Sequence, residues 1–138
     1  MKDFKVIISG PKEFKDYEFL KTECDRILSR KLVDPDVKVT IMSGCSDGVE
    51  NLGERYAKEK GLTVQTFPAD WNKLGKKAGI MRHKRMAKES NACILFFMSS
   101  DGGEIMNRIT KTLLSIAKEE KLLIREIDYK RKNEEDIK

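Results

Sequence analysis

The sequence predicts a single α/β domain in which a five-stranded, mainly parallel sheet is doubly wound, with helices on both faces. Three observations lead to this fold class. The 138 residues suit one domain. Short apolar runs alternate along the chain with longer segments of amphipathic periodicity. Most apolar runs end in small or turn-forming residues, as strands that lead into loops do.

Five apolar runs predict the strands, at residues 4–9, 37–42, 62–67, 91–98 and 122–127. The run 91–98 is the most apolar, as a strand covered on both faces must be, which predicts a central position. The run 122–127 is expected at or near an edge of the sheet. Alternating strands and helices of this kind imply parallel pairing.

Four segments have apolar residues at three- and four-residue spacing, which predicts helices at 14–31, 49–60, 80–90 and 104–121. The connection 69–79 is polar and holds the only Trp, Trp71, which could stack on a base but is expected to pack over the sheet edge. Residues 1–128 are expected to form the domain, and 129–138 a charged C-terminal tail.

Composition excludes several classes of protein. The longest apolar run, 92–98, is far shorter than the roughly 20 residues of a membrane span, so no membrane partner is expected. The N-terminus has no signal-peptide pattern, and the three Cys residues lack paired spacing. These features predict a reduced, cytoplasmic protein.

The formal net charge of +5 is compatible with an anionic partner. Lys and Arg are spread through the predicted helices beside Asp and Glu, and no aromatic residues alternate with a basic stripe. A small anionic ligand is therefore favoured over nucleic acid.

Ligands of such sheets bind outside the carboxyl ends of the strands, which selects the loops 9–14, 43–50, 68–83 and 99–104. Two of these loops consist of small residues before a predicted helix, an arrangement in which backbone N–H groups bind phosphate. Neither loop is a Walker loop or a G-x-G-x-x-G fingerprint.

Charged side chains near these loops are further candidates. Arg82 could pair with a phosphate. Glu50 and Glu104 could each accept a ribose hydroxyl or act as an acid–base group, although the helix dipole also favours Glu in a first turn. His83 is the only His, so no metal site is expected, and Cys45 lacks a base partner for a nucleophilic role.

Longer motifs carry a family resemblance. Residues 67–87 read F-P-A-D-W-x-x-x-G-x-x-A-G-x-x-R-x-x-R-M-A, residues 9–17 read S-G-P-K-x-F-x-D-Y, and residues 43–50 read S-G-x-S-x-G-x-E. They resemble F-P-A-D-W-x-x-x-G-x-x-A-G-x-x-R-N-x-x-M-A, G-S-R-x-F-x-D-Y and G-G-A-x-G-A-D of the YspA/YpsA-related SLOG family. The similarity extends from residue 4 to about residue 105.

This resemblance implies a Rossmann-like domain that binds a nucleotide or nucleotide-derived molecule, as a sensor, carrier or sequestering protein in a bacterium or phage. The same superfamily includes the "lonely guy" hydrolases, which cleave the N-glycosidic bond of nucleoside monophosphates, and the single-stranded-DNA binder DprA. Both activities stay open as alternatives. This chain departs from the family pattern in the loops where relatives do chemistry, which favours binding over hydrolysis and leaves enzymatic activity undecided.

The expected ligand-binding residues combine the loops with the resemblance. The phosphate is expected on the loops 43–48 and 100–103. Lys12 and Arg82 are expected to supply positive charge, and Glu50 to contact the ribose. In chain order the set is Gly10, Lys12, Ser43, Gly44, Ser46, Gly48, Glu50, Arg82, Ser100, Gly102 and Gly103. No metal cofactor is expected, and the ligand's identity and a homo-oligomeric state are left open.

Overall fold

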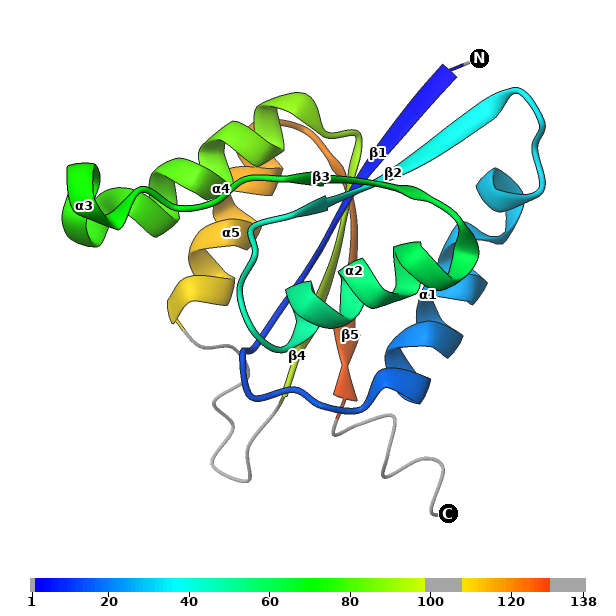
Figure 1. Cartoon of the computed structure of the whole chain (residues 1–138), viewed down its shortest axis with the longest axis horizontal. Helices are drawn as coiled ribbons and strands as arrows, with labels where there is room; N and C mark the ends of the chain where they lie inside the picture. The colour runs from blue at the N-terminus through cyan, green and yellow to red at the C-terminus, as the bar shows by residue number, and fades with distance from the viewer. Residues whose placement is uncertain (1, 99–107, 130–138) are drawn as a thin grey trace.

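The computed structural model describes residues 2–98 and 108–129, and its elements follow the predicted alternation (Figure 1). The strands are β1 (Lys2–Ser9), β2 (Val37–Ser43), β3 (Thr63–Thr66), β4 (Ala92–Phe97) and β5 (Leu123–Asp128). The helices are α1 (Tyr17–Leu32), α2 (Val49–Lys60), α3 (Trp71–Leu74), α4 (Ala78–Glu89) and α5 (Arg108–Glu119). A 3₁₀ turn, η1 (Gly75–Lys77), joins α3 to α4.

The strands form one sheet in the order β3-β2-β1-β4-β5, and every pair is parallel. This confirms the predicted fold class, the interior position of β4 and the edge position of β5. The middle of the sheet, however, is occupied by β1 rather than by β4. Helices cover both strands on both faces, so apolar content alone could not decide between them.

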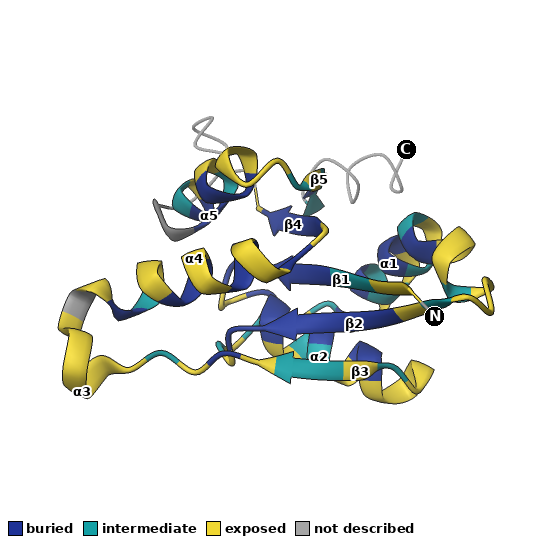
Figure 2. Ribbon diagram, turned by 90° about the horizontal axis from the view of Figure 1, so that it is seen from above, coloured by how far each residue is buried: buried dark blue, intermediate teal, exposed yellow. Residues whose placement is uncertain are grey.

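Alternating strand residues build two cores, one on each face of the sheet. Ile8 of β1 and Ile94 of β4 belong to the core under α1 and α2. Ile7 and Leu95, their neighbours along the same strands, belong to the core under α4 and α5. Figure 2 shows the buried residues gathered on the strands and on the inward sides of the helices.

Helix α1 begins later than predicted because Asp16 caps it. The Asp16 carboxylate accepts a hydrogen bond from the backbone N–H of Phe19 at 3.1 Å. Phe14 therefore precedes the helix, and its ring packs against those of Phe96 and Tyr129, with centroids 5.7 Å and 5.1 Å away. Tyr129, the first residue of the predicted tail, is thus held against the domain, and residues 130–138 lie outside the described residues.

The connection 69–79 contains more regular structure than the sequence indicates. Asp70 caps α3, because its carboxylate accepts a hydrogen bond from the backbone N–H of Lys73 at 3.0 Å. A single helical turn has too few residues to show apolar periodicity, which is why the pattern missed it. Helix α3 projects beyond the sheet at the left of Figure 1.

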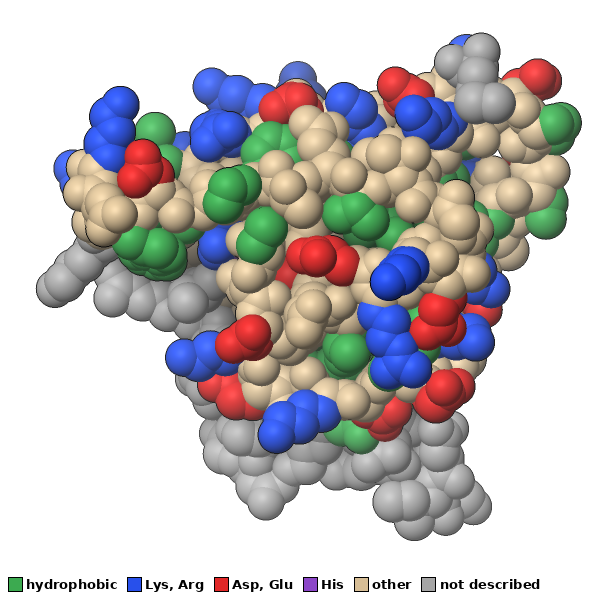
Figure 3. Space-filling view, in the orientation of Figure 1, with side chains coloured by type: hydrophobic (Ala, Val, Ile, Leu, Met, Phe, Trp, Pro, Cys, Tyr) green, Lys and Arg blue, Asp and Glu red, His purple; other side chains and the backbone are tan. Residues whose placement is uncertain are grey.

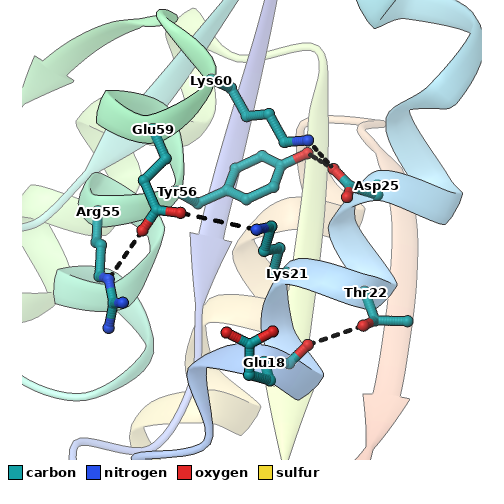
Figure 4. A network of polar contacts seen from close by, with 8 residues as sticks. All are labelled: Glu18, Lys21, Thr22, Asp25, Arg55, Tyr56, Glu59 and Lys60. Carbon is teal, nitrogen blue, oxygen red and sulfur yellow. Dashed lines mark hydrogen bonds and ion pairs between the residues drawn. The ribbon is translucent and has the colours of Figure 1, made fainter.

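Polar contacts join α1 to α2 on the outer side of the first core (Figure 4). The buried hydroxyl of Tyr56 donates a hydrogen bond to Asp25 at 2.7 Å, and Lys60 pairs with the same carboxylate at 3.1 Å. Burial raises the pKa of Asp25, but Tyr56 and Lys60 outweigh it and hold that pKa below its ordinary value. These contacts fix α2, whose first turn forms part of the site described below.

We expect Tyr56→Phe to lose about 1 kcal/mol of unfolding free energy, because the hydrogen bond to Asp25 disappears. Tyr17 provides the control, since its buried hydroxyl makes no well-formed hydrogen bond among the described residues, although burial and the nearby Glu59 raise its pKa. Tyr17→Phe should change stability by less than about 0.5 kcal/mol. Urea unfolding measures both, and equal losses would contradict the assigned role of the Tyr56–Asp25 bond.

Candidate functional site

A cavity of about 360 Å³ opens where β1 and β2 end. The crossovers reverse direction between β1 and β4, and the carboxyl ends of strands beside such a reversal are where these sheets bind ligands. The walls of the cavity come from the loop after β1, from the loop after β2 with the start of α2, and from single residues of α3 and α4. In chain order they are Gly10, Lys12, Glu13, Cys45, Ser46, Asp47, Glu50, Trp71 and Arg82.

The carboxylate of Glu50, in the first turn of α2, holds these walls together. Glu50 is only 3% exposed. One carboxylate oxygen, Oε1, accepts a hydrogen bond from the backbone N–H of Gly44 at 2.5 Å, and Oε2 accepts one from Ser9 Oγ at 3.0 Å. Nε2 of His83 on α4 lies 3.7 Å from Oε2. One side chain thus joins the ends of β1 and β2 to α2 and α4.

The surroundings keep this buried carboxylate ionised. Burial alone raises the pKa of Glu50, because it penalises the charged form. The nearby His83 and Arg82, together with the Ser9 hydroxyl, outweigh the burial and hold the pKa below the ordinary value of 4.5. A carboxyl group in this state is a hydrogen-bond acceptor and charge partner, whereas a general acid at neutral pH requires a raised pKa.

Arg82 reaches the cavity from α4 and is 8% exposed. Its Nη1 donates a hydrogen bond to the backbone carbonyl of Gly44 at 2.8 Å, so the guanidinium is fixed against the loop after β2. Its Nε has no hydrogen-bond partner in the part of the chain that the structure describes. A buried donor without an acceptor is costly, which makes Arg82 a natural partner for an anion in the cavity.

Backbone donors lie beside it at the start of α2. Within residues 2–98 and 108–129, no acceptor binds the backbone N–H groups of Ser46, Asp47 or Gly48. Gly48 is the N-cap residue of α2 and provides no side-chain cap. Unpaired N–H groups and the helix dipole both favour an anion at such a terminus.

The glycines of these loops serve close packing inside the protein. A Cβ on Gly48, where φ is +75°, would collide with the carbonyl of Pro11. A Cβ on Gly44 would collide with the Glu50 carboxylate and lie 2.9 Å from Arg82 Nε, and one on Gly10 would lie 2.6 Å from the carbonyl of Phe96. The sequence suggested that these glycines leave space for a phosphate, whereas they let the loops contact each other.

The structure divides the expected ligand-binding residues into three groups. Gly10, Lys12, Ser46, Glu50 and Arg82 line the cavity. Ser43, Gly44 and Gly48 lie behind its wall, where the Ser43 hydroxyl donates a hydrogen bond to Glu54 at 2.5 Å. The remaining candidates, Ser100, Gly102, Gly103 and Glu104, lie outside the described residues.

Four cavity residues were not among the expected ligand contacts: Glu13, Cys45, Asp47 and Trp71. All four belong to the selected strand-end loops 9–14, 43–50 and 68–83, so position alone could have included them. Trp71 differs, because packing was expected and its side chain is 59% exposed at the cavity. Among the described residues, no group of three or more His, Cys, Asp or Glu side chains could hold a metal ion.

Comparison with known proteins identifies the family. The model of the YspA, cpYpsA-related SLOG family matches residues 4–74, slightly more than half of the chain. The chain belongs to this family. The matched span of this SLOG protein includes the loops after β1 and β2 and ends before α4, which carries Arg82. Family membership indicates a nucleotide-related function.

One solved structure confirms the fold of the SLOG protein. This protein resembles the X-ray structure of TM1055, a structural-genomics target, with a TM-score of 0.54 and 19% identity over 90% of this chain and 72% of that one. A predicted subunit of tRNA methyltransferase from Methanocaldococcus jannaschii matches at a TM-score of 0.43 and 14% identity, over 91% and 69% of the chains. The search of curated proteins found no significant match to this SLOG protein. None of its described helices is long and apolar enough to cross a membrane.

Two glycine variants test the packing of the loops. Gly61, the C-cap of α2, has φ +70° with open space around its Cβ position, so Gly61→Ala should cost about 1–2 kcal/mol from backbone strain. Gly48→Ala should cost more, because the collision with the Pro11 carbonyl adds to the strain. Chemical unfolding compares the two variants, and equal losses would show that the loops do not depend on this close contact.

The Glu50 carboxylate should make stability depend on pH. A carboxyl group whose pKa is lower in the folded protein stabilises it above the ordinary value of 4.5, and this contribution disappears as the pH falls through the folded-state value. Glu50→Gln should therefore lose about 1.5–3 kcal/mol at neutral pH, with the difference from wild type shrinking below about pH 4.5. Exposed Glu119 provides the control, since Glu119→Gln on the surface should change the unfolding free energy at neutral pH by less than about 0.5 kcal/mol.

Proposed function

We propose that this protein binds a nucleotide-type small molecule in the cavity at the ends of β1 and β2, as a sensor, carrier or sequestering protein. One observation carries the proposal: Ser46 and Asp47, whose backbone N–H groups have no acceptor among the described residues, line the same cavity as Arg82, a buried cation whose Nε also lacks an acceptor there. Donors of these two kinds are the groups with which proteins bind phosphate.

The other walls suit the rest of a nucleotide. Lys12 adds a second positive charge to the cavity. The carboxylates of Glu13 and Asp47 form no hydrogen bond or ion pair with the described residues, so they can accept bonds from ribose hydroxyls. The exposed indole of Trp71 offers a flat surface on which a base can stack.

The ribose contact expected of Glu50 is better assigned to these two acceptors. Both oxygens of Glu50 already accept hydrogen bonds inside the protein, and its lowered pKa does not suit a general acid. The same facts favour binding over hydrolysis of a nucleoside monophosphate. Glu50 then acts on the ligand through the loops that it positions.

A comparison of two arginines on α4 tests the anion site. Arg82 lies in the cavity, whereas Arg85 is exposed and its guanidinium lies over the ring of Phe67 at 5.6 Å. A thermal-shift screen of nucleotides, ADP-ribose and cyclic dinucleotides identifies the ligand for calorimetry. Arg82→Gln should lose about 1.5–3 kcal/mol of binding free energy, roughly ten- to hundredfold in affinity. Arg85→Gln should lose well under 1 kcal/mol.

The controls separate a site from a charged surface. The titrations are done at two salt concentrations. If Arg82→Gln and Arg85→Gln lose equally little affinity and both losses vanish at high salt, the anion site at Arg82 is contradicted. Since Arg82 also holds the Gly44 carbonyl, its variant must be shown to remain folded at the titration temperature. Chromatography of the same mixtures detects free base. Base release that disappears in Glu50→Gln would establish the hydrolase in place of the binding protein.

A further inference from the structure

The positive charge of the chain is concentrated in one segment. Residues 71–88 contain no Asp or Glu, and their cations are Lys73, Lys76, Lys77, Arg82, Lys84, Arg85 and Lys88. Because the whole chain carries only +5, the rest of it is net negative. The expectation that basic and acidic residues are evenly mixed is therefore wrong for this segment, which forms α3, η1 and α4 up to Lys88, the residue before Glu89.

Helix geometry aligns three of these cations. Lys84 and Lys88 lie four residues apart on one side of α4, Lys77 immediately before the helix lies seven residues from Lys84 and so on the same side, and all three are exposed. Buried Arg82 and Met86 occupy the opposite side. Figure 3 shows Lys and Arg side chains gathered along the upper edge of the molecule, where α4 lies in Figure 1. The exposed row of Lys77, Lys84 and Lys88 is called the lysine track below.

The lysine track is not arranged like a membrane-binding face. Such a helix has its apolar residues together in the middle of the exposed side, flanked by cations. On α4 the order is reversed. The lysines take the middle, and the exposed apolar residues Ile80 and Met81 lie on opposite flanks, separated by the track.

We propose that the lysine track binds the backbone of a single-stranded nucleic acid whose terminal nucleotide enters the cavity. This inference rests on the proposed function and names its ligand as an oligonucleotide. None of the three lysines forms an ion pair with a described residue, so their charges are available to phosphates. A row of cations along a 12-residue helix, roughly 18 Å long, matches a linear polyanion better than a compact one.

The track and the cavity share one helix. Arg82 reaches the cavity from the inner side of α4, while the track occupies its outer side. Lys77 immediately precedes the helix, and the ring of Trp71 would lie 3.7 Å from a Cβ on Gly79 in its first turn. A strand with its last base at Trp71 therefore meets the beginning of the track. An acidic peptide would match the charges but would leave the indole and the nucleotide cavity without a role.

The test compares two triple variants with the same change in net charge. The first is Lys77→Gln, Lys84→Gln, Lys88→Gln, and the control is Lys38→Gln, Lys58→Gln, Lys118→Gln, exposed lysines of other elements. Probes are short single-stranded DNA and RNA oligonucleotides of random sequence, followed by fluorescence anisotropy. The track variant should bind about 10- to 100-fold more weakly. Its salt dependence of log K should fall by about 2, at roughly 0.7 per phosphate.

The control variant should bind oligonucleotides like the wild type. A mixture of the four nucleoside monophosphates should displace the terminal nucleotide of the oligonucleotide from the cavity without displacing its backbone from the lysine track. Equal losses in the two triple variants would overturn the track, because net charge alone would explain them. So would binding to phosphatidylserine vesicles without binding to oligonucleotides.

Arg82→Gln distinguishes this proposal from the one on which it rests. If the track variant binds nucleoside monophosphates normally and oligonucleotides like the wild type, the track is wrong and the cavity stands. If oligonucleotide binding depends on the track but neither Arg82→Gln nor the monophosphates affect it, the nucleotide cavity is wrong, and with it the entry of a terminal nucleotide.

Discussion

The ionised carboxylate of Glu50 is the constraint on which the site depends. A buried charge is tolerated only when charges and hydrogen bonds compensate it, and here the partners come from the end of β1, the loop after β2 and α4. Elements distant in the sequence are thereby fixed in one geometry at the ends of the strands. The cavity is the space that this geometry leaves between the loops.

The same constraint explains why Arg82 keeps a donor free. The backbone of Gly44 donates its N–H to Glu50 and accepts a hydrogen bond from Arg82 at its carbonyl, so Gly44 lies between the carboxylate and the guanidinium. A direct bidentate pair would satisfy both charges internally and leave nothing for a ligand. The arrangement fixes Arg82 through Nη1 while Nε stays without an acceptor among the described residues. A rigid, incompletely satisfied cation is suited to a small anion.

The sequence predicted the element order, the parallel sheet and the loops of the cavity because these follow from local patterns. Apolar runs and periodic segments are local, and the rule for ligands at strand ends needs only their order. It could not predict which way a glycine's missing Cβ points, since Gly48 faces Pro11 through a contact between different loops. Nor could it predict the exposure of Trp71, which depends on how far α3 projects from the sheet.

The net charge of +5 did not reveal the basic segment 71–88, for a related reason. A sum over the chain hides where charges lie, and residues 71–88 carry their cations without acidic neighbours. In the fold, some of these cations are buried and others are exposed, because α4 can bury only one side against the sheet. Arg82 falls on the buried side and is fixed at the cavity, while Lys77, Lys84 and Lys88 fall on the exposed side. One amphipathic helix therefore carries a fixed cation at the cavity and a solvated row of cations on its outer side, so the row can be replaced without disturbing the packing of the helix.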